Sequence, residues 1–124
     1  NQRVQIPCKN SSTIQKISVI LASVNMVLTM KYNEHQLRLL CEMLEFIEAF
    51  RRGELSYYLL VGNLESALDA GEFKNEEMVE LWYDYWGPLE IWNATKGDSV
   101  IIEDVNPDLS NMESFLKRIL SEVQ

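Results

Sequence analysis

All the tryptophans of this 124-residue chain lie in one short stretch, residues 75–93. Apolar residues recur there at alternating steps of four and three, which is the spacing of one apolar stripe along a helix. The stripe consists of Met78, Trp82, Tyr85, Leu89 and Trp92, and Trp86 widens it. Each buried tryptophan removes about 150–250 Å² from water, and no other segment has as much apolar surface to bury. We therefore expect a helix over residues 75–95 at the centre of the fold.

The other side of this central helix is acidic. Its carboxylates fall mostly opposite the apolar stripe: Glu76, Glu77, Glu80, Asp84 and Glu90. Asn75 is suited to cap the helix, and acidic residues in a first turn are favoured by the helix dipole. Pro88 lacks a backbone N–H, so it should kink the helix or split it into two pieces. Lys96-Gly97-Asp98 is expected to close the helix.

Two helices are predicted before the central one. Residues 33–53 begin with a capping box formed by Asn33 and Gln36. Residues 56–71 follow, with Ser56 as the cap. Because only two residues separate these helices, they should be antiparallel neighbours. The expected inward-facing residues are Leu37, Leu40, Cys41, Leu44, Ile47 and Phe50 in the first helix and Leu59, Leu60, Leu64, Ala67 and Leu68 in the second.

The segment 99–109 admits two interpretations. Its first five residues are rich in β-branched side chains, which suits one short strand at the edge, but an apolar loop is preferred because a lone strand needs a partner. Asn106-Pro107-Asp108 predicts a turn. Ser110 and Glu113 then form a capping box for a last helix over 111–122. Its expected inward-facing residues are Met112, Phe115, Leu116, Ile119 and Leu120.

Residues 1–30 differ from the rest in charge. They contain three basic residues and no acid, so the functional module could begin near Met30. Residues 1–11 are interpreted as a loose arm. Residues 12–30 have helical spacing but also the β-branched residues of a strand, and both interpretations stay open. The apolar run Ile17–Met30 is too short to span a bilayer; a basic start before such a run resembles a signal sequence, but no small-residue cleavage site follows.

Together these patterns predict an all-α fold. Helical segments joined by short polar connections are typical of a small helical bundle. We expect a single domain over residues 1–124, with four to five helices and a helical core at 33–122. One short strand or hairpin at the edge is the remaining alternative.

The sequence lacks the motifs of enzymes and metal sites. His35 is the only histidine, and we expect it to be exposed and structural. Two-metal bundles use Glu-x-x-His pairs, which this chain does not contain. The EF-hand loop, the P-loop and the dinucleotide fingerprint are also absent. We therefore expect no metal, no cofactor and no enzymatic activity, with a carboxylate–metal enzyme as a minor alternative.

The charge distribution constrains the partners. The formal net charge is −8, and all 19 acidic residues follow residue 30. Such a surface repels nucleic acid and anionic membranes and attracts basic proteins, although acidity also serves simply to keep a protein soluble. Cys8 and Cys41 are too few for a disulfide framework, which indicates a reducing compartment and predicts a cytoplasmic protein.

One acidic surface is the best candidate for partner binding. Tyr83 lies off the apolar stripe, beside acidic residues, and a tyrosine ringed by carboxylates suits an interface that captures a basic protein. The alternative is that such tyrosines only half-bury at the edges of the bundle. The candidate binding residues are Asp69, Glu72, Glu76, Glu77, Glu80, Tyr83 and Asp84.

The segment Glu42 to Trp92 contains Arg52-Gly53-Glu54-Leu55, then Leu60-Val61-Gly62-Asn63-Leu64-Glu65, then Trp82 with Trp86-Gly87-Pro88-Leu89-Glu90. In these elements the chain resembles the small acidic helical immunity proteins of bacterial polymorphic and contact-dependent growth-inhibition toxin systems. The resemblance implies a protein without enzymatic activity that binds one cognate toxin, commonly a basic nuclease. We expect a monomer or weak dimer. The alternative function is a helical adaptor or regulatory subunit that binds a host protein complex.

Overall fold

The computed structural model describes residues 32–122 of the chain. The predicted arm at 1–11, the helix or strand at 12–30 and Cys8 lie outside the described residues. The described part consists of α2 (Glu34–Arg51), α3 (Tyr57–Gly71), α4 (Glu76–Lys96) and α5 (Ile102–Ser121), with a single 3-10 turn, η3 (Gly97–Ser99), between the last two helices. No strand occurs in residues 32–122, so the all-α prediction is confirmed there.

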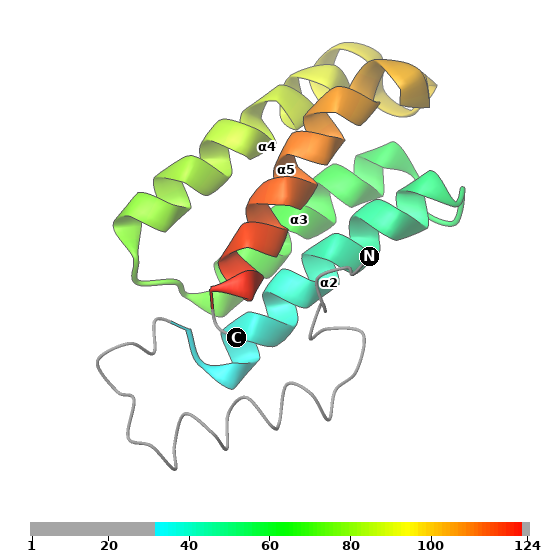
Figure 1. The fold of residues 1–124 in the computed structure, drawn as a ribbon. Coiled ribbons are helices and arrows are strands. Elements are labelled where there is room, and N and C mark those ends of the chain that lie inside the picture. The colour runs from blue at the N-terminus through cyan, green and yellow to red at the C-terminus, as the bar shows by residue number, and fades with distance from the viewer. Residues whose placement is uncertain (1–31, 123–124) are drawn as a thin grey trace.

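The four helices run up and down in sequence order (Figure 1). Helix α2 packs against α3 and α5, and α4 packs against the same two helices. Short connections favour this arrangement, because they leave consecutive helices antiparallel and adjacent. The long helices therefore surround one shared core, and α3 and α4 form one side of the bundle.

The helix starts follow from local capping. The Asn33 side chain accepts from the Gln36 backbone N–H at 2.7 Å, and the Gln36 side chain accepts from the Asn33 N–H at 3.0 Å. Ser56 accepts from Leu59 at 3.2 Å, and Asn75 accepts from Met78 at 3.1 Å. Each side chain satisfies a backbone donor that has no partner within its helix. The capping predictions for these three helices are confirmed.

Contacts with residues outside the helix determine where α3 ends. Gly71 is its last residue, and the Phe73 ring covers it so closely that a side chain at 71 would collide with the ring. Glu72 then adopts the left-handed conformation, with φ of 47°. The buried Gln36 side chain donates from its Nε2 to the Gly71 carbonyl at 2.9 Å and to the Glu72 carbonyl at 3.5 Å. The amide of Gln36 thus satisfies carbonyls that the helix end leaves unpaired.

The predicted apolar stripe of α4 forms part of the core. Trp82 has no exposed surface, and its Nε1 donates to the Met43 sulfur of α2 at 3.3 Å. Trp86 stacks on Trp82, with ring centroids 5.9 Å apart. Tyr85 stacks on Phe115 of α5 at 4.8 Å. The stripe therefore joins α4 to α2 and α5, as a central helix requires.

One inward-facing assignment is wrong. Leu59 lies in the first turn of α3 and is 48% exposed, whereas its neighbour Leu60 is fully buried. The face of α3 that packs against α2 and α4 turns Leu59 towards solvent. The remaining predicted inward residues of α3 are buried: Leu60, Leu64, Ala67 and Leu68.

Both prolines lie inside continuous helices, so the predicted turn at Pro107 and the predicted split at Pro88 are wrong. Helix α4 continues through Pro88 as one element, so Pro88 does not split it, and α5 continues through Pro107 where a turn was expected. Buried side chains flank each proline, with Leu89 beside Pro88 and with Val105 and Leu109 on either side of Pro107. Their burial in the common core outweighs the hydrogen bond that each proline removes.

The start of the last helix is also corrected. Helix α5 begins at Ile102, nine residues before the predicted start at 111. Ser110 and Glu113 therefore lie inside the helix and do not cap it. Both instead bind Arg51 at the end of α2, whose Nη1 lies 2.8 Å from Glu113 Oε1 and whose Nη2 donates to Ser110 Oγ at 3.2 Å. Arg51 Nε also donates to Asn106 at 3.1 Å.

Arg51→Met should destabilise the protein by about 1–3 kcal/mol, because it removes three hydrogen bonds from a charged, partly buried group. Urea denaturation followed by circular dichroism measures the loss. Arg52→Met is the matched control, since within residues 32–122 Arg52 pairs only with the exposed side chains of Glu48 and Glu54. Its replacement should cost negligible stability. Equal losses in the two variants would show that the Arg51 network contributes no stability.

Candidate interaction surface

The candidate surface is formed by the second half of α3, the connection after it and the first half of α4. All seven residues predicted to bind a partner are exposed: Asp69, Glu72, Glu76, Glu77, Glu80, Tyr83 and Asp84. Their exposure follows from the positions of the buried residues, because Leu68, Met78 and Trp82 turn the intervening residues outwards.

Tyr83 lies where this surface crosses from α3 to α4. It is 37% exposed, and its hydroxyl donates to Glu65 Oε2 of α3 at 3.1 Å. Its ring stands edge-on to Trp82 and Trp86, with centroids 5.1 and 5.7 Å apart. Burial raises the pKa of the Tyr83 phenol, and Glu65 and Asp69 raise it further. Tyr83 therefore stays neutral near pH 7 and is held in one orientation between α3 and α4.

On α4 the predicted residues lie on two adjoining sides of the helix that meet at Glu80. Glu76, Glu80 and Tyr83 follow a spacing of four and three, so they share the side of α4 that faces α3. Glu77 and Asp84 are seven residues apart and lie together farther round the helix, towards solvent. Asp69 of α3 lies near enough to Tyr83 to raise the pKa of its phenol, and Glu77, Glu80 and Asp84 form a continuous acidic row along α4.

Within the described residues, no cation pairs with the carboxylates of α3 and α4. Within residues 32–122, every ion pair belongs to α2, to the turn after it or to α5. These pairs are Arg38–Glu34, Arg51–Glu113, Arg52–Glu48, Arg52–Glu54 and Lys117–Glu113. Acidic side chains on α3 and α4 outnumber the basic ones, and none of them forms an ion pair with another residue of 32–122. This face therefore keeps its negative potential.

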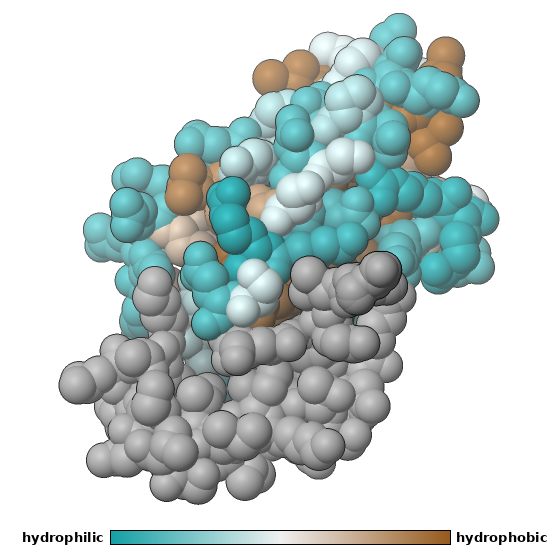
Figure 2. Space-filling view, in the orientation of Figure 1, coloured by the Kyte–Doolittle hydropathy of each residue, from teal (hydrophilic) through white to brown (hydrophobic). Residues whose placement is uncertain are grey.

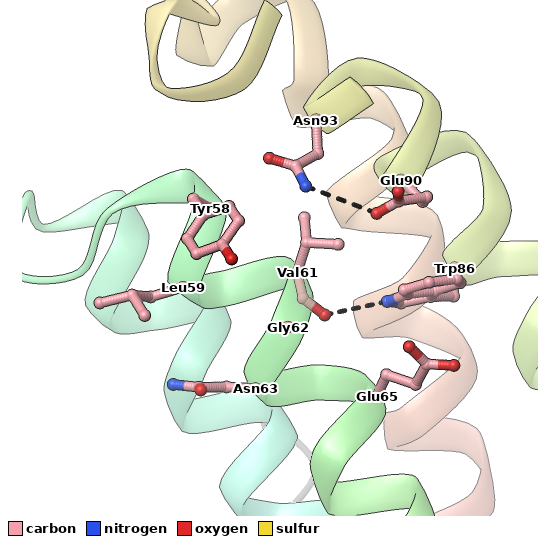
Figure 3. A pocket seen from close by; sticks show the side chains of 9 residues that line it. All are labelled: Tyr58, Leu59, Val61, Gly62, Asn63, Glu65, Trp86, Glu90 and Asn93. Atoms are coloured by element: carbon pink, nitrogen blue, oxygen red, sulfur yellow. Dashed lines mark hydrogen bonds between the residues drawn. The ribbon is translucent and has the colours of Figure 1, made fainter. Parts of the chain in front are cut away.

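A pocket beside this surface was not predicted. It has a volume of about 300 Å³ and lies between α3 and α4 (Figure 3). Trp86 Nε1 donates to the Val61 carbonyl at 3.1 Å across its floor. Its lining residues are Tyr58, Leu59, Val61, Gly62, Asn63, Glu65, Trp86, Glu90 and Asn93. The spacing of Trp86 and Glu90, one helical turn, indicated that they lie on the same side of α4. It could not show which residues of α3 face them.

Two polar side chains in the pocket are incompletely paired. Asn93 Nδ2 donates to Glu90 Oε1 at a long 3.5 Å. Asn93 Oδ1 is buried and accepts no hydrogen bond from the described residues. A buried acceptor without a donor is unfavourable, so this amide is suited to a ligand that supplies one.

The other side chains that could take part in catalysis or metal binding lie outside this surface. The Tyr57 hydroxyl donates to the Leu89 carbonyl at 2.7 Å, and burial raises the pKa of Tyr57. His35 is exposed, and Cys41 is buried. Residues 32–122 contain no cluster of three or more histidine, cysteine or acidic side chains able to hold a metal ion. Over the same residues, no helix combines the length and apolarity needed to cross a bilayer.

The chain was compared with protein-family models, with curated proteins and with solved structures, and none of these comparisons found a match. The charge and geometry of the surface itself are therefore the basis for inferring function.

Proposed function

We propose that this protein is a non-enzymatic immunity protein that binds a basic protein toxin, most simply a nuclease, and blocks it. The observation that carries the proposal is the acidic face of α3 and α4, where none of the carboxylates forms an ion pair with another residue that the structure describes. The sequence resemblance to small acidic immunity proteins supports the same conclusion.

The physical reason concerns the groove of a nuclease. An enzyme that holds phosphate must be cationic where it does so, and an acidic inhibitor can cover that site or a surface beside it. Opposite potentials on two surfaces raise association rates by roughly 10- to 1,000-fold. Fast capture suits a protein that has to neutralise a toxin in the cytoplasm before damage occurs.

Tyr83 supplies an anchor within this charged face. Tyrosines are frequent in the energetically important parts of interfaces. Trp82 and Trp86 flank its ring, and its hydroxyl is held by Glu65. Because its orientation is fixed before binding, little side-chain entropy is lost when a partner covers it. We assign it to the contact surface with Asp69 and the acidic residues of α4.

The test is capture of a partner from cells that express this protein together with the adjacent open reading frames. At low salt, the purified protein should retain a basic polypeptide, and high salt should weaken the complex. Expression of that polypeptide alone should stop growth, and co-expression with this protein should restore it. Capture that is insensitive to salt, or growth that is not restored, would contradict the proposal.

A second candidate function is supported by exposed apolar side chains. Ile91 is 64% exposed near the end of α4, and Ile101 is 58% exposed just before α5. Figure 2 shows apolar surface at this end of the bundle, where α4 leads into α5. Such side chains suit a helical adaptor that docks on a protein complex. Salt-insensitive capture of a multi-subunit complex would favour this function over immunity.

A further inference from the structure

We infer that the pocket between α3 and α4 receives an arginine side chain of the basic partner. The inference rests on the proposed function and names the group that the acidic face recognises. The pocket volume of about 300 Å³ accommodates one side chain. Figure 3 shows Tyr58 and Val61 of α3 on one side and Glu90 and Asn93 of α4 on the other.

Glu90 provides the charge for this recognition. Its side chain is partly buried, and within the described residues it forms no ion pair. Among the described residues, the one hydrogen bond to its side chain is the 3.5 Å contact from Asn93 Nδ2. The carboxylate therefore keeps most of its capacity to accept hydrogen bonds. A guanidinium binds a carboxylate through two parallel N–H···O bonds, which favours arginine geometrically as well as electrostatically.

Asn93 provides an acceptor that lacks a donor. Its Oδ1 is buried and has no hydrogen-bond partner in the described structure. In Figure 3 the amide projects from α4 into the space between Tyr58 and Glu90. A guanidinium carries five N–H donors in a fixed plane, enough to bind Glu90 and still supply the Asn93 oxygen after a rotation of the amide. An ammonium group lacks this planar fork.

Tyr58 provides an aromatic face at the mouth of the pocket. Its side chain is 63% exposed, while its backbone N–H is held by Asp98 Oδ1 at 2.8 Å. Arginine stacks on aromatic rings, and this attraction adds to the carboxylate pairing. The backbone contact fixes the position of residue 58 without using its ring.

The pocket is continuous with the acidic interaction surface. Glu65 lines the pocket and also accepts the hydrogen bond of Tyr83. In Figure 3 Glu65 and Glu90 lie on either side of Trp86. A basic partner that covers Tyr83 therefore places its neighbouring residues over the pocket. This continuity favours a protein-borne arginine over a free small molecule.

The test uses the protein alone and N-acetyl-L-arginine methylamide as the probe. The Trp86 indole N–H, assigned by comparison with Trp86→Phe, should shift and saturate in a ¹H–¹⁵N NMR titration. The citrulline derivative has nearly the same shape without the charge and should cause little shift. The lysine derivative should bind more weakly. Glu90→Gln should weaken arginine binding roughly tenfold and Tyr58→Leu roughly two- to fivefold, whereas Glu103→Gln, which removes an exposed charge on α5, should leave it unchanged.

The outcomes separate this inference from the proposed function. No saturable shift, equal shifts with citrulline, or equal binding of lysine would overturn the arginine assignment and leave the capture experiment to judge immunity. With the captured partner, Glu90→Gln should raise the dissociation rate roughly tenfold and Glu103→Gln should leave it unchanged. Unchanged dissociation in both variants would overturn the assignment of the pocket to the interface.

Discussion

Replacement of Glu77, Glu80 and Asp84 by lysine should slow association with the basic partner roughly 10- to 100-fold and remove most of its salt dependence. These residues are exposed, and within residues 32–122 they have no ion pair. Reversal therefore changes the potential of the α4 face without breaking an internal contact. Stopped-flow association at several salt concentrations measures both effects.

The control variant makes the same change in net charge by reversing three acidic residues outside α3 and α4. Glu42, Glu45 and Glu103 are exposed on α2 and α5, and their reversal should have a much smaller effect because a charge acts mainly within a Debye length of about 8–10 Å. Equal slowing in the two triple variants would mean that net charge alone governs encounter. Normal association of the α4 variant would place the contact surface elsewhere.

Trp82→Ala should lower the free energy of unfolding by about 3–5 kcal/mol, a large part of the 5–15 kcal/mol typical of a domain. Trp82 is completely buried, donates to the Met43 sulfur and stacks against Trp86. Alanine would leave a cavity at the junction of α2 and α4. Urea denaturation followed by far-ultraviolet circular dichroism measures the loss.

Trp92→Ala is the matched control for this substitution. Trp92 is only partly buried, and its Nε1 donates to Asp108 of α5 at 3.1 Å. The same change in side chain should therefore cost clearly less at position 92 than at 82. A larger loss at Trp92 would show that the core is organised around the α4–α5 contact and not around Trp82.

Features that depend on neighbouring residues were predictable. Capping by Asn33, Ser56 and Asn75 involves hydrogen bonds over three residues, so the residue types and their spacing were sufficient. The burial of Met78, Trp82 and Leu89 followed from helical periodicity in the same way.

Features that depend on tertiary packing were not predictable from local pattern. Pro88 and Pro107 are strong signals against helix, yet each helix continues through its proline, where buried side chains such as Leu89 and Leu109 pack into the core. Ser110 and Glu113 have the spacing of a capping box, but Arg51 from a helix about sixty residues earlier takes both side chains. Local rules cannot include a partner at that sequence distance.

The candidate site also has features that local sequence predicts and features that depend on tertiary packing. The exposure of the acidic residues was predictable, because carboxylates opposite an apolar stripe face water. The contact of Tyr83 with Glu65 and the pocket at Glu90 depend on how α3 and α4 are aligned along their lengths. That alignment is fixed by core contacts such as the bond from Tyr57 to the Leu89 carbonyl.

The Gln36 side chain has a consequence for local unfolding. It joins the first turn of α2 to the last turn of α3 by its bonds to the Gly71 and Glu72 carbonyls. Isolated helices fray at their ends independently, but these two ends share a buried amide, and we therefore expect them to open together. Because Gln36 also binds the Glu72 carbonyl, we expect the Glu72 carboxylate to be held at a helix end that resists fraying.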